Sequence, residues 1–153
     1  MRGVTYSVGY NNEMIAASLE DIAVAGDGNQ FLALLKTEAG SILPIVIDAF
    51  QAISISAGRS GDAPGRPMTH DLILSMVELF GAKIDRIEIT DIVEGVYFAM
   101  LVIKRQGVNF EIDARPSDAL AVAVRAQVPI LIAEHVVEQN ALVDDYGGNA
   151  FEA

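Results

Sequence analysis

The sequence contains no cysteine and no tryptophan, and only 10 of its 153 residues are lysine or arginine. Without cysteine the chain forms neither disulfide bonds nor thiolate metal sites. Its longest apolar stretches, Ile42–Ile47 and Ala119–Val124, end at charged residues, far short of the about 20 residues that cross a bilayer. No continuous apolar segment follows Arg2, so a signal peptide is not expected. We therefore expect a cytoplasmic protein without a membrane partner.

Basic residues are also few relative to acidic ones. The chain has 21 acidic residues and a formal net charge of −11, and residues 134–153 contain acids but no lysine or arginine. Such a charge opposes binding to nucleic-acid phosphates, which depends on lysine and arginine. Composition alone therefore argues against a nucleic-acid partner, unless a local basic patch or bound divalent cations reverse the local charge.

What the sequence has in excess is apolar side chains. Hydrophobic residues make up 52% of the chain, and the mean hydropathy is +0.36. The length fits a single domain with one core. Because one small core cannot bury so many apolar residues, we expect a homodimer or a higher homo-oligomer.

Two groups of short extended segments predict two antiparallel meanders. The first group comprises Met14–Val24, Gln30–Lys36 and Ile42–Ile47, and Pro44 places the third of these at a sheet edge or a bulge. The second group comprises Lys83–Thr90, Val96–Lys104 and Val108–Asp113, and a further short strand is predicted at Pro129–Ala133.

Helical periodicity predicts three to four helices. The first begins after Asp48, presents Phe50, Ile53 and Ala57 on one face, and ends at Gly58. In the second, Thr69 is the expected N-cap, Gly81 ends the helix, and the expected buried face holds Leu72, Met76, Leu79 and Phe80. The third is expected from Ser117, as its cap, to Ala126, and the last spans Glu134–Leu142. The predicted fold class is therefore α+β, a single domain with a mostly antiparallel or mixed sheet.

Two polar clusters interrupt this apolar chain, each directly before a predicted helix. They are RPMTHD, Arg66–Asp71, and DARPSD, Asp113–Asp118. A structural interpretation explains their hydroxyl residues as helix caps and their second aspartates as first-turn acids. It does not explain why each cluster carries an arginine, or why the first carries a histidine, His70, the residue type most often used to transfer protons. Helix N-termini attract anions, so both clusters are candidate phosphate sites, and we expect them to lie close together.

Three runs carry a resemblance to a known family. The runs Leu43–Ala52, Arg66–Ile103 and Glu111–Val137, with their motifs RPMTHDLI, DIVEGVYFA and DARPSDALAVAVR, resemble the bifunctional nuclease domain family. The resemblance covers residues 14–142 and leaves an N-terminal extension at 1–13 and an acidic tail, expected to be flexible, at 143–153. It implies an α+β domain named for the degradation of DNA and RNA by plant members.

The residues that match the family's motifs are Arg66, Thr69, His70, Asp71, Asp91, Asp113, Arg115, Ser117 and Asp118. The first helix departs from the family pattern, because Asp48, Ala49 and Gln51 stand where members commonly have a glycine followed by acidic residues. A carboxylate role on that helix is therefore not expected, and Asp91 is more simply a turn residue.

A metal-dependent nuclease needs carboxylates around Mg²⁺ or Mn²⁺, a base and a cation for the phosphate. Asp71, Asp113 and Asp118 are the candidate metal ligands, His70 is the candidate base, and Arg66 or Arg115 is the candidate phosphate-binding residue. The expected catalytic residues are His70, Asp71, Asp113, Arg115 and Asp118, with Arg66, Thr69 and Ser117 contacting a DNA or RNA substrate.

Two other functions use the same residues. One is a non-catalytic oligomeric module that binds a small anionic ligand or a protein partner, which the acidic charge favours. The other is an enzyme acting on a small phosphorylated substrate, although the sequence has no glycine-rich phosphate loop. His135 receives no role in any of these interpretations.

Overall fold

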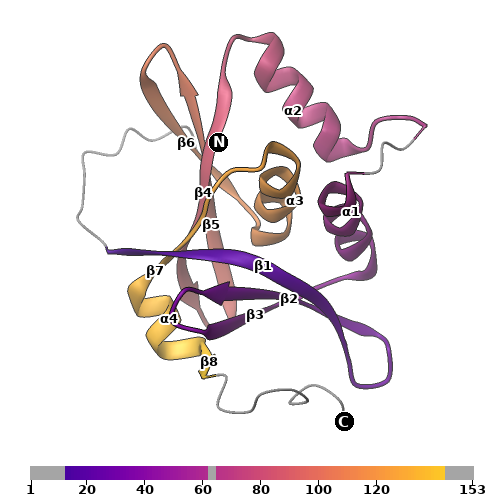
Figure 1. Ribbon diagram of the computed structural model, residues 1–153, viewed down its shortest axis with the longest axis vertical. Coiled ribbons are helices and arrows are strands. Elements are labelled where there is room, and N and C mark those ends of the chain that lie inside the picture. The colour runs from indigo at the N-terminus through magenta and orange to yellow at the C-terminus, as the bar shows by residue number, and fades with distance from the viewer. Residues whose placement is uncertain (1–12, 62–64, 144–153) are drawn as a thin grey trace.

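The computed structural model describes residues 13–61 and 65–143. Its strands are β1 (Met14–Ala25), β2 (Gln30–Thr37), β3 (Ser41–Ile47), β4 (Lys83–Val93), β5 (Val96–Arg105), β6 (Val108–Ala114), β7 (Ile130–Ala133) and β8 (Leu142–Val143). Together they form a single sheet in the order β6-β5-β4-β7-β1-β2-β3-β8 (Figure 1). The sheet is mixed, since β4 and β7 run parallel and the other neighbours run antiparallel. The predicted α+β fold with a single domain is therefore confirmed.

The two meanders form as predicted. In the second, the hairpin turns lie at Glu94-Gly95 and Gln106-Gly107, where all four residues have positive φ. This conformation matches the twist of paired strands. In the first, Pro44 pairs with Leu34 of β2, while β8 pairs only with the first two residues of β3. Pro44 has no N–H to donate, and it lies in the part of β3 that does not pair with β8.

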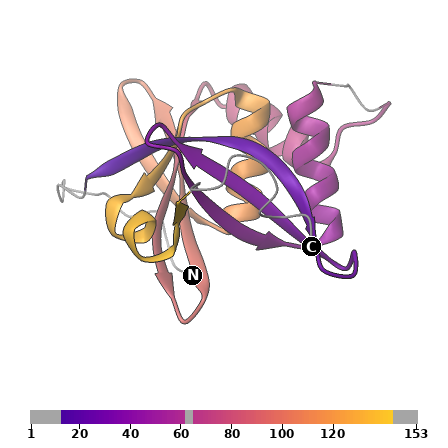
Figure 2. The ribbon, with the colours of Figure 1, turned by 60° about the horizontal axis from the view of Figure 1, so that its bottom comes forward.

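The described helices are α1 (Ala49–Ser60), α2 (Thr69–Leu79), α3 (Pro116–Ala126) and α4 (Glu134–Asn140). Helix α3 is central, with Ala119–Ala123 fully buried, and both α1 and α2 pack against it. Helix α4 lies apart from these three, beside β7 and β3 (Figure 2). The predicted last helix, Glu134–Leu142, ends earlier than expected because Leu142 pairs with Ile42 as part of β8.

The predicted end of the first helix is wrong. Gly58 lies within α1, and Gly61 forms the left-handed C-cap, with φ +70°. A Cβ atom on Gly58 would lie 2.6 Å from Nη1 of Arg125 and 2.8 Å from Cγ2 of Val124, so Gly58 allows α1 to approach α3 closely. At the start of α1, Asp48 and Gln51 form a capping box, which gives Asp48 a structural role.

The predicted buried faces of the first two helices are also wrong. On α2, Leu72, Met76, Leu79 and Phe80 are 50–80% exposed. The side chains packed against the core are instead Ile73, Leu74 and Val77. On α1, Phe50 and Ile53 are exposed, and Ala52 and Ile55 are buried. Because each helix has apolar residues on more than one face, periodicity did not distinguish the face that packs.

The hydroxyl residues of the polar clusters do not cap their helices. The N-cap positions are occupied by Met68 and Arg115, in place of the predicted Thr69 and Ser117. Neither Met68 nor Arg115 caps its helix with a side-chain hydrogen bond. Ser117 is buried in the first turn of α3, behind Pro116. The other two expectations for these turns are correct, since Asp71 and Asp118 are first-turn acids. The predicted N-terminal extension (1–13) and acidic tail (143–153) lie outside the described residues, except for residues 13 and 143.

Candidate functional site

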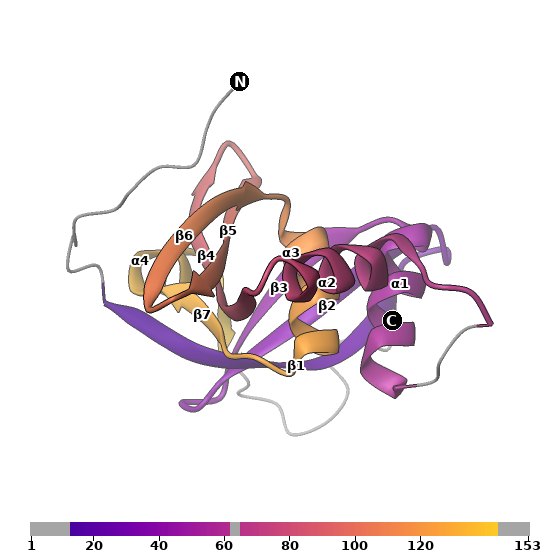
Figure 3. The ribbon, with the colours of Figure 1, turned by 90° about the horizontal axis from the view of Figure 1, so that it is seen from above.

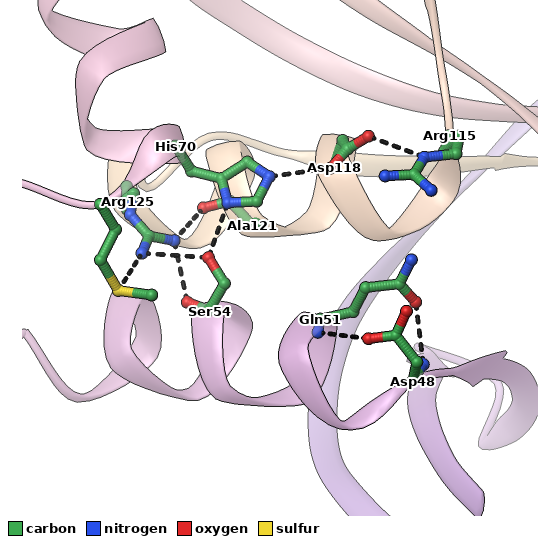
Figure 4. A network of polar contacts seen from close by, with 9 residues as sticks. Asp48, Gln51, Ser54, His70, Arg115, Asp118, Ala121 and Arg125 are labelled. Atoms are coloured by element: carbon green, nitrogen blue, oxygen red, sulfur yellow. Dashed lines mark hydrogen bonds and ion pairs between the residues drawn. The ribbon is translucent and has the colours of Figure 1, made fainter.

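The two polar clusters meet, as expected, where α2 and α3 begin. Nε2 of His70, in the first turn of α2, lies 2.9 Å from Oδ1 of Asp118, in the first turn of α3 (Figure 4). The other carboxylate oxygen of Asp118 accepts from Nε of Arg115 at 3.0 Å. Asp118 therefore joins one residue from each cluster.

A serine on α1, Ser54, contacts the other ring nitrogen of His70. Oγ of Ser54 lies 2.6 Å from Nδ1 of His70, and the serine is only 5% exposed. Ser54 Oγ also accepts from Nη2 of Arg125 at 3.4 Å. Because the Asp118 carboxylate only accepts hydrogen bonds, Nε2 of His70 is the donor in the contact with Asp118. Ser54 and Asp118 thus hold the His70 ring from both of its nitrogens.

Arg125 connects the three packed helices. Its guanidinium, with a side chain 5% exposed, donates to Oδ1 of Asp71 at 2.8 Å and to the carbonyl oxygens of Ala121 and Ser54. Asp71 in turn accepts from the backbone N–H of Met68 at 2.8 Å, which fixes the start of α2. Arg125 therefore holds α1 and α2 on α3 and positions the turn that carries His70.

The two aspartates of this network have lowered pKa values. Burial of Asp118 opposes the shift, but the hydrogen bonds from His70 and Arg115 outweigh it and hold its pKa below the usual value. The backbone N–H of Met68 and then the Arg125 guanidinium lower the pKa of Asp71. Both carboxylates are therefore charged at neutral pH.

A groove of about 810 Å³ opens beside this network, with one polar end. Figure 3 shows α2 between α1 and the hairpin of β5 and β6, and the groove is lined by α2, this hairpin and the start of α3. The polar end presents Thr69, His70, Asp113, Arg115 and Asp118. Asp113 is exposed, and the side chain of Arg115 is 71% exposed. The remaining lining is apolar.

Three predicted site residues do not line this groove. Arg66 is exposed elsewhere on the surface, Asp71 is paired with Arg125, and Ser117 is buried. Across residues 13–61 and 65–143, no group of three or more acidic or histidine side chains is placed to hold one metal ion. The structure does not gather Asp71, Asp113 and Asp118 into one ligand set, because Asp71 is paired with Arg125 and holds the helices together. A metal requirement stays a prediction.

Asp91 and His135 form a separate pair. Oδ1 of Asp91 lies 3.2 Å from Nε2 of His135, and both side chains are substantially exposed. The hydrogen bond from His135, and then that from the backbone of Ile92, lowers the pKa of Asp91. Asp91 lies at a bulge within β4, so its assignment to a turn is wrong.

Sequence reasoning did not identify Ser54 or Arg125. Arg125 had a detectable signal, since it is the last residue of the motif DARPSDALAVAVR. Ser54 had none, because a serine in the middle of a helix has no pattern that marks it as the partner of a histidine 16 residues away. None of the helices in the described part of the chain has the length and apolar character needed to cross a membrane.

Comparisons with known proteins identify the family. The model of the bifunctional nuclease domain matches residues 33–145. An uncharacterized protein of Mycobacterium tuberculosis is 37% identical over 123 residues, covering 80% of this chain and 73% of that protein. Bifunctional nuclease 1 of Arabidopsis thaliana is 28% identical over 114 residues, and the bifunctional nuclease of Oryza minuta is 30% identical over 114 residues.

Each plant match covers 71% of this chain, but only 35% of the Arabidopsis protein and 34% of the Oryza protein. The chain thus spans about a third of the plant relatives. The matched region contains Ser54, His70, Asp118 and Arg125 and the whole groove described above. The chain belongs to the bifunctional nuclease domain family.

Proposed function

We propose that this chain cleaves phosphodiester bonds of DNA or RNA at the polar end of the groove. The observation that carries the proposal is the convergence of His70, Asp113, Arg115 and Asp118 at one end of a groove large enough for a small ligand. Family membership supports it, because the plant relatives are named bifunctional nucleases.

Arg115 is the proposed phosphate-binding residue. Its Nε donates to Asp118, and among the described residues its two terminal amino groups have no further partner, so they are available to a phosphate oxygen. A guanidinium in this position would stabilise the charge that develops on the phosphate during cleavage. His70 acts as a positioning residue, because it holds Asp118, and Asp118 holds Arg115.

Asp113 is the proposed general base, in place of His70. Both ring nitrogens of His70 are engaged, with Ser54 and Asp118, and its side chain is only 13% exposed. Asp113, in contrast, is exposed in the groove, and its carboxylate has no partner among the described residues. A carboxylate within reach of a water or a ribose hydroxyl can accept the proton that cleavage releases.

We further propose a requirement for Mg²⁺ or Mn²⁺. Asp71 is paired with Arg125, but three carboxylates are not needed, since Mg²⁺ is commonly held by one or two carboxylates together with substrate phosphates. Asp113 is the carboxylate of the groove that fits this mode, and it would hold the ion through one oxygen and leave the other for the proton. The ion would supply positive charge at the phosphate, which a chain of net charge −11 needs against repulsion.

The test is cleavage of labelled single-stranded DNA and RNA by the wild type and by Asp113→Asn and Arg115→Met. We expect cleavage to need Mg²⁺ or Mn²⁺, to stop in excess EDTA, and to fall at least 100-fold in either variant, about the effect of losing a general base. Ser56→Ala, which changes an exposed residue of α1 outside this groove, is the control.

Equal cleavage by the wild type and both variants would indicate a contaminating nuclease and overturn the proposal. Undiminished cleavage in EDTA would overturn the metal requirement alone. Binding of the oligonucleotide without cleavage would favour the second candidate function, a module that binds a small anionic ligand. That candidate is supported by the single arginine in a groove that is otherwise mainly apolar.

A further inference from the structure

The apolar part of the groove is larger than a phosphate alone requires. Next to the polar end, its walls are formed by apolar side chains of α2, β5 and β6, among them Met76, Val96, Tyr97 and Phe98. Several of these are exposed although they are apolar, including Met76 at 50%, Val96 at 59% and Phe98 at 43%. An apolar surface of this kind beside one arginine fits a ligand that is charged at one end and flat and apolar along the rest.

The groove is poorly suited to a duplex. Double-stranded nucleic acid presents mainly phosphates to a protein surface, and affinity for it increases with the number of lysine and arginine contacts. Among the groove residues Arg115 is the one arginine or lysine, and Arg59, Arg86 and Arg125 form ion pairs elsewhere. A duplex would therefore meet one cation and the two carboxylates of Asp113 and Asp118, and its bases would not reach the apolar walls.

An unpaired base satisfies both parts of the groove. Proteins that bind single strands combine a cation for the backbone with apolar and aromatic side chains against the exposed base. We infer that the groove binds a single strand, with one phosphate on Arg115 and the adjacent unpaired base on the apolar walls. The inference rests on the proposed function, because it names the substrate class of the same site.

The test compares one DNA strand of about 12 nucleotides, a length typical of single-strand sites, with the same strand annealed to its complement. A 2-aminopurine in the strand reports the base, because its fluorescence rises when it leaves the stack. We expect binding of the free strand in EDTA with increased fluorescence. In Mg²⁺ or Mn²⁺ we expect cleavage of the free strand at least 10-fold faster than cleavage of the duplex.

Two valines provide a matched pair of variants. Val96 lies in the groove and Val46 lies outside it on β3, and both are 59% exposed. Val96→Glu and Val46→Glu change the net charge equally. We expect Val96→Glu to weaken binding of the free strand about 10-fold, the value of one buried valine side chain, and Val46→Glu to leave it within about twofold. Val96→Thr, which keeps the side-chain shape, guards against loss of folding and is expected to weaken binding to a smaller extent.

The outcomes separate the inference from the function. Equal or faster cleavage of the duplex, or no effect of the Val96 variants, overturns the inference and leaves the nuclease proposal intact. Fluorescent binding of the free strand without cleavage supports the inference and overturns the nuclease proposal. If the Val96 variants change the molar mass in light scattering but not the strand preference, the groove is an interface between copies of the chain, and the inference is wrong.

Discussion

Arg125 is a charged side chain that is almost completely buried, which is costly unless each of its donors finds a partner. It has those partners in Asp71 and in the carbonyl oxygens of Ser54 and Ala121. Removal of one member of a buried ion pair destabilises a protein more than the pair itself stabilises it, because the other charge remains. Arg125 is thus a residue whose loss affects the fold and the site together.

We expect Arg125→Met to lower the free energy of unfolding by about 3 kcal/mol, the lower part of the range for broken buried pairs, since Asp71 keeps some contact with water. Arg115→Met is the matched control, because the Arg115 side chain is 71% exposed and its ion pair contributes at most about 1 kcal/mol. Urea unfolding of the two variants measures both values. Equal costs for the two substitutions would contradict the structural role of Arg125.

The residues of the site were predictable only in part. The polar clusters indicated His70, Asp113, Arg115 and Asp118, because each cluster gathers polar and charged residues directly before a predicted helix. The roles of Asp71 and Ser54 depend on contacts with Arg125. Arg125 is 54 residues from Asp71 in the sequence and 71 residues from Ser54. Spacing along the chain carries no information about contacts at that separation. A carboxylate that binds a guanidinium and one that binds a metal therefore look the same in the sequence.

At the scale of elements, the contact between α1 and α3 depends on the absence of a side chain at Gly58. Nη1 of Arg125 and the methyl group of Val124 occupy the space where a Cβ atom would lie. Nη1 is also held by two carbonyl oxygens, so it cannot move aside freely. The glycine therefore lowers the helix propensity of α1 but allows the close packing that brings Ser54 to His70.

Gly58→Ala separates these two effects. Helix propensity alone would stabilise the protein by about 1 kcal/mol. Because overpacking costs about 1–3 kcal/mol, we expect a net destabilisation of about 1 kcal/mol instead. Thermal unfolding measures it, with Ser56→Ala on the exposed face of α1 as the control for propensity. A gain in stability for Gly58→Ala would show that α1 and α3 are not in tight contact there.

Element positions were predicted better than element faces. Strands β1 to β7 were found within about three residues at each end, since alternation and turn residues are local signals, whereas the two-residue β8 was not predicted. The faces of α1 and α2 were assigned to the bulkiest residues, but the sides that pack on α3 and the sheet are decided by neighbours distant in the sequence. Where a helix is apolar on two sides, only the tertiary structure identifies the inner one.

For the whole molecule, the misassigned face of α2 bears on the expected oligomer. Leu72, Leu79 and Phe80 lie outside the groove, on and just after α2, and are exposed by 55–80%. Exposed apolar side chains of this kind are typical of surfaces that contact another protein. The homo-oligomer remains a prediction, and the structure supplies the surface on which it can be tested.

We expect light scattering to give a dimer, twice the 16.3 kDa of one chain, and Leu72→Glu to shift it towards the monomer. Val24→Glu is the matched control, because Leu72 and Val24 are both 55% exposed and Val24 lies on β1. A wild-type mass of one chain at all concentrations would contradict the prediction, and so would an equal effect of the two variants.

The place of β7 in the sheet also determines the order in which the chain can fold. This four-residue strand lies between β1 and β4 and pairs with both, although it follows β1 to β6 in the sequence. During synthesis each meander can form by local pairing, but the two halves of the sheet cannot be paired before residues 130–133 emerge. Helix α3, on which α1 and α2 pack, ends at Ala126, shortly before β7. The site and the complete sheet therefore both depend on the C-terminal part of the described chain, and both form late in synthesis.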